Sequence, residues 1–230
     1  MRFNLHDNVV ARALGRLCDL VILNILFMIC SIPIITIGAA TTALYTVMLK
    51  FVKDEEGYIF SGFFIAFKDN FRKATISWLI MLVIGLTITF NFFITTDIGE
   101  LTGAHWLQLF FVGIFSLFSL IWVFIYMYLF PLIARYESPI KSTFINAILI
   151  AIAKLPYTFL LLIIHVAPIV ALLFLDIEAL IMGLSIWLFV GFAAMAWLNS
   201  KILRKVFEVV DNREDSANEG SASEDSINED

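Results

Sequence analysis

Two polar side chains with functional chemistry lie inside long uncharged stretches of the sequence. His165 stands in the middle of one stretch, three residues before Pro168, and Asn24 lies in the first stretch. An imidazole titrates near neutrality and could relay a proton or bind a sugar hydroxyl. The alternative is a hydrogen bond to a neighbouring helix. An amide among apolar helices either joins two of them or lines a substrate path, so both residues are candidates for a functional site.

Prolines predict where the backbone around these side chains is interrupted. Pro33 follows the stretch that contains Asn24, and Pro168 follows His165. Proline removes an intrahelical hydrogen bond, so Pro33 and Pro168 are predicted helix-break positions. Broken helices expose backbone groups that can bind a substrate. These features keep a small transporter or channel among the hypotheses.

The sequence contains none of the sharp catalytic and cofactor motifs that we sought. There is no Gly-x-x-x-x-Gly-Lys-Ser/Thr, no His-Glu-x-x-His and no Cys-x-x-Cys. Cys18 and Cys30 are too few for a disulfide framework or a zinc site. We therefore predict no catalytic residue, no metal ligand and no cofactor. An enzyme is the least favoured class.

The composition indicates that lipid is the solvent for most of the chain. Of 230 residues, 61% are hydrophobic and only 15% are charged, against about 45–50% and about 25% in soluble domains. Long stretches without Asp, Glu, Lys or Arg exceed the roughly 20 residues that a helix needs to cross a bilayer. The predicted fold is an all-α, polytopic transmembrane bundle of about five spans. After the first, the spans are predicted at Thr75–Thr95, Trp106–Ala134, Pro156–Leu175 and Ala179–Leu198.

The first apolar stretch allows two topologies. No charged residue lies between Asp19 and Lys50, but Pro33 interrupts the run. A single broken span would place the N-terminus outside. A hairpin that folds back near residues 31–37 would give six spans, but legs of about 15 residues would reach only about 22 Å. The single broken span is the preferred prediction.

Two amphipathic segments are predicted to lie at the membrane surface. Residues 1–18 carry a helical apolar face opposite Arg12 and Arg16. Residues 59–73 combine phenylalanines at helical spacing with basic residues at the far end. Aromatic and basic residues together can also bind single-stranded nucleic acid. Beside a membrane span we expect no nucleic-acid partner.

The chain divides into the interfacial segment 1–18, a transmembrane domain over 19–205 and an acidic tail over 206–230. From Asp211 to the end, acidic residues greatly outnumber basic ones and almost nothing is apolar. Such a composition predicts disorder. Basic residues occupy alternate loops, which favours a multi-pass plasma-membrane protein with a cytoplasmic C-terminus.

Small residues in the second half of the first stretch predict close helix packing. Gly38 and Thr42 are one helical turn apart, as are Ala39 and Ala43. Small side chains let the backbones of two membrane helices approach closely. We therefore expect another helix to contact this face.

Two motifs resemble those of a known family. Residues 31–45 read Ser-Ile-Pro-Ile-Ile-Thr-Ile-Gly-Ala-Ala-Thr-Thr-Ala-Leu-Tyr, and residues 55–75 run from Glu-Glu-Gly-Tyr-Ile to Phe-Lys-Asp-Asn-Phe-Arg-Lys-Ala-Thr. They look like the two signatures of the YesL family, which comprises small bacterial membrane proteins built around a domain of unknown function. The resemblance implies a polytopic plasma-membrane protein. No catalytic or ligand residue is established for the family, so none is carried over.

The resemblance also implies a cellular context. Members of this family often accompany sugar-uptake transporters and sensor kinases, which suggests a carbohydrate-linked role. The main hypothesis is a non-enzymatic accessory or regulatory component whose partners are the lipid bilayer and the membrane subunit of such a transporter or kinase. The alternative is a small solute transporter or channel in its own right. The sequence does not determine the oligomeric state.

Overall fold

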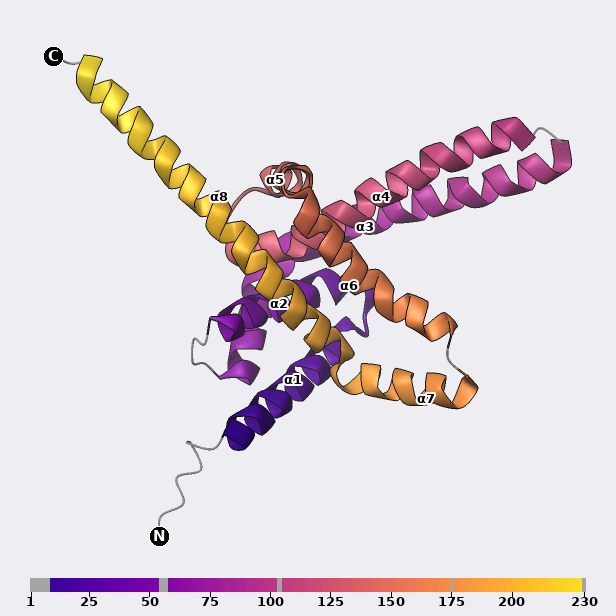
Figure 1. The fold of residues 1–230 in the computed structure, drawn as a ribbon, viewed down its shortest axis with the longest axis horizontal. Coiled ribbons are helices and arrows are strands. Elements are labelled where there is room, and N and C mark those ends of the chain that lie inside the picture. Colours follow the sequence, from indigo (N-terminus) through magenta and orange to yellow (C-terminus); the bar gives the residue numbers. More distant parts are fainter. Residues whose placement is uncertain (1–8, 54–57, 103–104, 175, 229–230) are drawn as a thin grey trace, which may run out of the picture.

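Helices account for all regular secondary structure in the part of the chain that the structure describes. The computed structural model describes residues 9–53, 58–102, 105–174 and 176–228. Its helices radiate from a small common core (Figure 1). In chain order they are α1 (Val9–Ser31), the 3₁₀ helix η2 (Ile34–Thr36), α2 (Ile37–Val52), α3 (Ile59–Thr102), α4 (His105–Arg135), α5 (Ile140–Ala153), α6 (Leu155–Leu173), α7 (Ile177–Ile186), the π-helical segment η3 (Trp187–Gly191) and α8 (Phe192–Asn228).

Among the described residues, five helical segments are long and apolar enough to cross a membrane. The pair α5–α6, bent by 99° at its junction, supplies a sixth candidate. The predicted class, an all-α transmembrane bundle of five to six spans, is therefore confirmed. The five segments are Ala13–Ser31, Ile34–Val52, Ile59–Thr95, His105–Arg135 and Ile177–Val209.

The first apolar stretch forms two helices rather than one broken span. α1 ends at Ser31, η2 follows Pro33, and α2 turns back and packs on α1 (Figure 1). The preference for a single span was therefore wrong. The first leg of the hairpin is longer than expected because residues 9–17, predicted as a separate surface helix, are the start of α1, whereas α2 has 16 residues. At 1.5 Å per residue, the 23 residues of α1 reach about 34 Å, enough for a bilayer core of about 30 Å.

The helix α2 is the centre of the bundle. In its candidate span 61% of the residues are buried, more than in any other candidate span of the described chain. Ala39 and Ala43 have no exposed surface. A Cβ added to Gly38 would lie 2.5 Å from the carbonyl oxygen of Ala74 on α3. The predicted close approach at these small residues is confirmed, and α3 is the helix that makes it.

Residues 59–73 form the first part of the long helix α3. The helix continues from Ile59 to Thr102, 44 residues in all, because no proline interrupts it. Phe63 is fully buried, whereas Phe60 is 61% exposed. The predicted helix is thus present, but its expected end near residue 73 was wrong.

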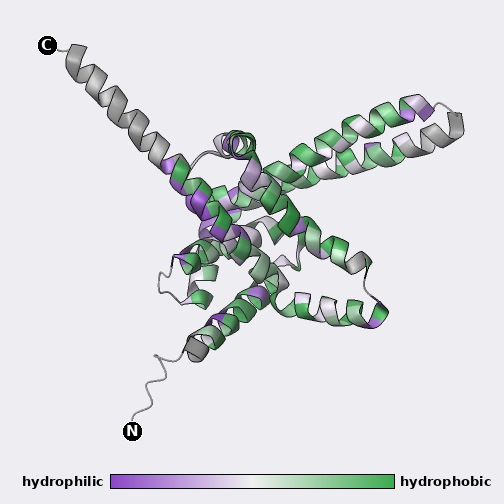
Figure 2. Ribbon diagram, viewed as in Figure 1, coloured by the Kyte–Doolittle hydropathy of each residue, from purple (hydrophilic) through white to green (hydrophobic). Residues whose placement is uncertain are grey.

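The outer parts of α3 and α4 form a projecting arm, which we define as residues 82–95 and 105–121. The two helices lie side by side and extend away from the core (Figure 1). Apolar residues cover most of the arm's length (Figure 2). No residue in the most apolar 18-residue stretch of α4 is buried. At the base of the arm, the Trp122 indole N–H donates to the carbonyl oxygen of Met81 at 2.9 Å.

A buried pair of hydroxyl groups holds the corner between α5 and α6. The Thr158 hydroxyl donates to the carbonyl oxygen of Ala151 at 2.8 Å, across the corner. The Tyr128 hydroxyl of α4 lies 2.9 Å from Thr158 Oγ1. The helix α5 was not predicted, because its charged flanks are typical of a loop. The helix α6 begins where a span was predicted.

The helix α8 continues far into the segment predicted to be disordered. Val206 and Phe207 have no exposed surface, and Asp211 forms an ion pair with Arg135 at the end of α4. The predicted boundary at residue 206 was therefore wrong. The packed bundle extends to Asp211 and the helix to Asn228. Once a helix is anchored, each further residue gains a hydrogen bond without a new nucleation cost.

Candidate functional site

A cavity of about 160 Å³ lies inside the helical bundle. Three helices distant in sequence meet at its polar wall: Tyr45 comes from α2, His165 from α6 and Asn199 from α8. Aromatic side chains, including Phe27 and Phe130, form much of the remaining wall. The central position of α2, made possible by its small residues, brings Tyr45 within reach of α8.

Hydrogen bonds connect the three polar side chains. Asn199 Nδ2 donates to the Tyr45 hydroxyl oxygen at 3.1 Å and lies 3.4 Å from His165 Nε2. His165 Nδ1 lies 2.9 Å from the carbonyl oxygen of Leu161. Because a carbonyl only accepts, Nδ1 carries a proton, which leaves Nε2 as the acceptor for the Asn199 amide. The imidazole is thus held in one orientation.

The protein does not fully satisfy the Asn199 amide. This residue is 1% exposed, and its Oδ1 has no hydrogen-bond partner among the described residues. Exchanging the oxygen and nitrogen of the amide would only move the deficit to its other end. A buried polar group without a partner costs about 1–3 kcal/mol. Such a cost calls for an explanation, and a ligand site is one.

Asn24 joins α1 to the π-helical segment η3 and the start of α8. Its Nδ2 donates to the carbonyl oxygen of Leu188 at 2.6 Å, and its Oδ1 accepts from the Ala193 N–H at 3.0 Å. In a π-helix the Ala193 N–H would donate to the Leu188 carbonyl oxygen, five residues earlier. The Asn24 amide takes the place of that bond by pairing with both groups. Of the two roles predicted for Asn24, the geometry is that of a helix-joining residue. The segment directly precedes Phe192, which lines the cavity.

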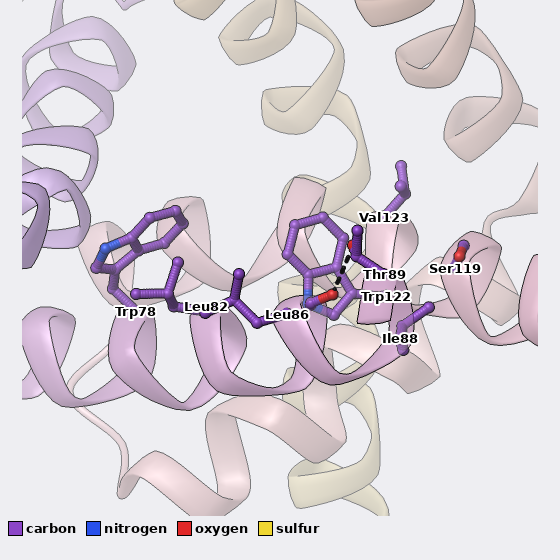
Figure 3. A pocket seen from close by; sticks show the side chains of 9 residues that line it. Trp78, Leu82, Leu86, Ile88, Thr89, Ser119, Trp122 and Val123 are labelled. Carbon is purple, nitrogen blue, oxygen red and sulfur yellow. Dashed lines mark hydrogen bonds between the residues drawn. The ribbon is translucent and has the colours of Figure 1, made fainter. Parts of the chain in front are cut away.

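A second hollow lies at the arm rather than in the core. It is a groove of about 330 Å³ between α3 and α4, with Trp78 at one end and Thr89 and Ser119 toward the other (Figure 3). The Thr89 hydroxyl donates to the carbonyl oxygen of Gly85 at 2.9 Å. No described residue that lines the groove is charged. The groove therefore suits an apolar group or a helix better than an ion.

One of the three polar cavity residues was predicted from the sequence. His165 was a candidate, but Tyr45 and Asn199 were missed. Tyr45 closes the motif at 31–45, and Asn199 directly follows the last predicted span. Each residue thus lies beside a recognisable sequence feature, but nothing in the sequence indicates that Tyr45 and Asn199 contact each other. In the described ranges no three His, Cys, Asp or Glu side chains lie together as a metal site.

The two predicted helix breaks have different outcomes. Pro33 separates α1 from η2, as predicted. Pro168 lies inside α6, which continues to Leu173, so the predicted break there was wrong. A membrane helix tolerates proline where its surroundings satisfy the backbone. Pro168 has no N–H to donate to the carbonyl oxygen of Ile164, four residues earlier. His165 does not replace that donor, because its ring nitrogen pairs with the carbonyl oxygen of Leu161.

These features define the class: the chain is a polytopic helical membrane protein with a small, mainly apolar cavity in its bundle, into which a few polar side chains face. Residues 20–92 match a family model described as "Protein of unknown function, DUF624". The chain is 29% identical over 147 residues to the uncharacterized protein YesL of Bacillus subtilis (strain 168). These matches confirm the resemblance found in the motifs and support assignment of the chain to the YesL family.

The matches cover only part of this chain and part of the relative. The alignment covers 64% of this chain and 66% of YesL, just under two thirds of that relative. The family model covers α2 and includes Asn24 and Tyr45, but it ends within α3. No solved structure matches the chain.

Proposed function

We propose that the protein is a non-enzymatic accessory component of the plasma membrane that acts by binding a partner membrane protein. The projecting arm is the observation that carries this proposal. The family resemblance implies an association with sugar uptake, so the membrane subunit of a sugar transporter is the partner to test first. A sensor-kinase membrane subunit is the next.

The arm exposes hydroxyl-bearing side chains within two candidate membrane spans, although the hydroxyls of Thr87 and Thr89 also donate to carbonyl groups of their own helix. Thr87 and Thr89 are exposed on α3, and Ser116 is exposed on α4. Lipid tails are as apolar as leucine, so exposed apolar surface does not by itself favour a protein partner. Small and hydroxyl side chains, however, are enriched where membrane helices meet. They support a transmembrane helix of another protein as the occupant of this face.

Replacing Thr87 and Thr89 together with leucine is expected to lower partner recovery about tenfold. Such a loss corresponds to about 1.4 kcal/mol of binding free energy. The measurement is co-purification of the tagged full chain from native membranes, with quantification by mass spectrometry. The matched control is the double variant Val83→Leu, Ile84→Leu on the same helix, which keeps the hydroxyl groups.

Two outcomes would contradict this proposal. One is isolation of the unaltered chain without any stoichiometric partner. The other is recovery of a second copy of the chain alone, which would make the arm a homodimer surface. The control variant should retain the partner at the unaltered level.

We propose further that both termini face the cytoplasm. With five spans the N-terminus and the nearby Arg16 would lie outside, against the preference of basic residues for the cytoplasmic side. Six crossings, with α5–α6 counted as one, would put Arg16 on the same side as Lys50, Arg135 and Lys201. In a background without Cys18 and Cys30, Asp176→Cys is expected to react with a membrane-impermeant maleimide in intact cells. Ser138→Cys should react only after lysis. Labelling of both positions in intact cells would refute this topology.

The second candidate function is movement of a small solute by the chain itself. The internal cavity beside His165 is the observation that favours it, since polar residues at membrane depth often mark solute paths. Uptake of a solute by purified protein in liposomes, with loss in His165→Ala, would support this alternative.

A further inference from the structure

The volume of the bundle cavity sets the size of what it can hold. At about 160 Å³, it is close to the engineered protein cavity of about 150 Å³ that binds benzene. It is much smaller than the roughly 300–1,000 Å³ typical of pockets for drug-sized ligands. One aromatic ring with a single substituent is therefore the size of body that we expect to fill the cavity.

The cavity wall sets the chemistry of the ligand. No Asp, Glu, Lys or Arg is among the described residues that line it, so a charged ligand would be left without a counter-ion. Hydrogen-bonding groups gather on one wall, at Tyr45, His165 and Asn199. The other lining residues are mainly aromatic and aliphatic, with two further hydroxyl groups from Thr41 and Tyr126. Such an arrangement suits a neutral molecule with one polar end and an apolar body.

A polyol fits this wall poorly. Each hydroxyl turned toward the aromatic surface would lose its hydrogen bonds to water without replacement, at a cost of about 1–3 kcal/mol. A single hydroxyl, in contrast, can be satisfied at the polar wall. The Tyr45 oxygen accepts from Asn199, while the Tyr45 O–H has no acceptor among the described residues and is free to donate to a ligand oxygen.

We propose that this cavity is a binding site for a small neutral amphiphile of phenol size. Its hydroxyl lies at the wall formed by Tyr45 and Asn199, and its ring packs against Phe27 and Phe130. The site is independent of the partner-binding arm, because the residues that form it come from the core of the bundle.

The test uses the full chain in detergent micelles and 4-fluorophenol as the probe, observed by ¹⁹F NMR. We expect saturable binding that unlabelled phenol competes away. Fluorobenzene, which has no hydroxyl, should bind about tenfold more weakly. The variant Tyr45→Phe should weaken 4-fluorophenol binding about fivefold to tenfold and leave fluorobenzene binding unchanged. The control Tyr58→Phe alters a tyrosine that is 90% exposed and should affect neither probe.

A second variant tests the same cavity in case Tyr45→Phe does not fold. Ala196 is 2% exposed and lines the cavity, so Ala196→Leu should fill the space and abolish binding of both probes. The proposal is overturned if binding is not saturable, if both probes bind equally well, or if Ala196→Leu binds as the unaltered chain does. These readouts do not depend on any protein partner, so they are separable from the test of the arm.

Discussion

Replacing Gly38 with alanine is expected to destabilise the protein by about 3 kcal/mol or more. The added Cβ would lie 2.5 Å from the Ala74 carbonyl oxygen and would also meet the Cβ of Trp78. A backbone atom cannot move aside as a flexible side chain can, so α2 and α3 would have to separate. Overpacking of this kind costs about 1–3 kcal/mol, and more where the neighbours are rigid.

The measurement is the free energy of unfolding in SDS titrations, followed by tryptophan fluorescence. Two glycines supply matched controls, because a Cβ at Gly15 or Gly113 would meet nothing within 4 Å. Alanine at either position should change stability by less than about 1 kcal/mol. Equal effects at all three glycines would show that helix propensity, rather than the contact between α2 and α3, governs the result.

The second large effect is expected at Asn24. Replacement by leucine keeps the approximate volume but removes both hydrogen bonds to the chain around η3, at Leu188 and Ala193. Hydrogen bonds between membrane helices average about 0.6 kcal/mol, up to about 1.7 kcal/mol. A buried backbone group left unpaired adds about 1–3 kcal/mol. We therefore expect Asn24→Leu to lose about 2–3 kcal/mol in the same SDS titration.

Asn91 provides the control for this prediction. Its amide donates to the carbonyl oxygen of Thr87 within its own helix and joins no second helix through that bond. Asn91→Leu should therefore cost less than about 0.5 kcal/mol. If the two variants lose the same free energy of unfolding, the hydrogen bonds between α1 and the chain around η3 do not stabilise the protein more than a bond within one helix, and the prediction is wrong.

The stability of the bundle and its surface chemistry thus depend on different parts of the chain. The core gathers around α2, where Gly38 and Ala39 allow close packing. The arm contributes little to this core, since its most apolar stretch on α4 is not buried. Substitutions at Thr87 and Thr89 should therefore change partner binding without a large change in unfolding free energy.

Much of the architecture was predictable from local composition. Each later span follows from a long stretch without charges, because a charged side chain is costly at membrane depth and an apolar one is not. The small residues from Gly38 to Ala43 predicted close helix packing, since the space for a second backbone depends on side-chain size alone. The break at Pro33 follows equally from the missing N–H of proline.

Helix ends were less predictable, because tertiary contacts extend helices beyond their local signals. The first leg of the hairpin gains length from residues 9–17, which join α1. At the other end of the chain, Phe207 and Asp211 keep α8 packed past the predicted start of the tail. Pro168 was predicted to interrupt a helix that in fact continues through it. In each case neighbouring helices outweigh the local preference.

By itself the sequence determined the solvent of this protein, its helical class and the stripe of small residues at which its central helix packs. The cavity was decided only by the tertiary structure. Its hydrogen bond between Tyr45 and Asn199 joins positions 154 residues apart, and neither residue carries a signal that names the other. Hydropathy and side-chain size act residue by residue, whereas a site exists only where the packing of several helices brings distant side chains to one place.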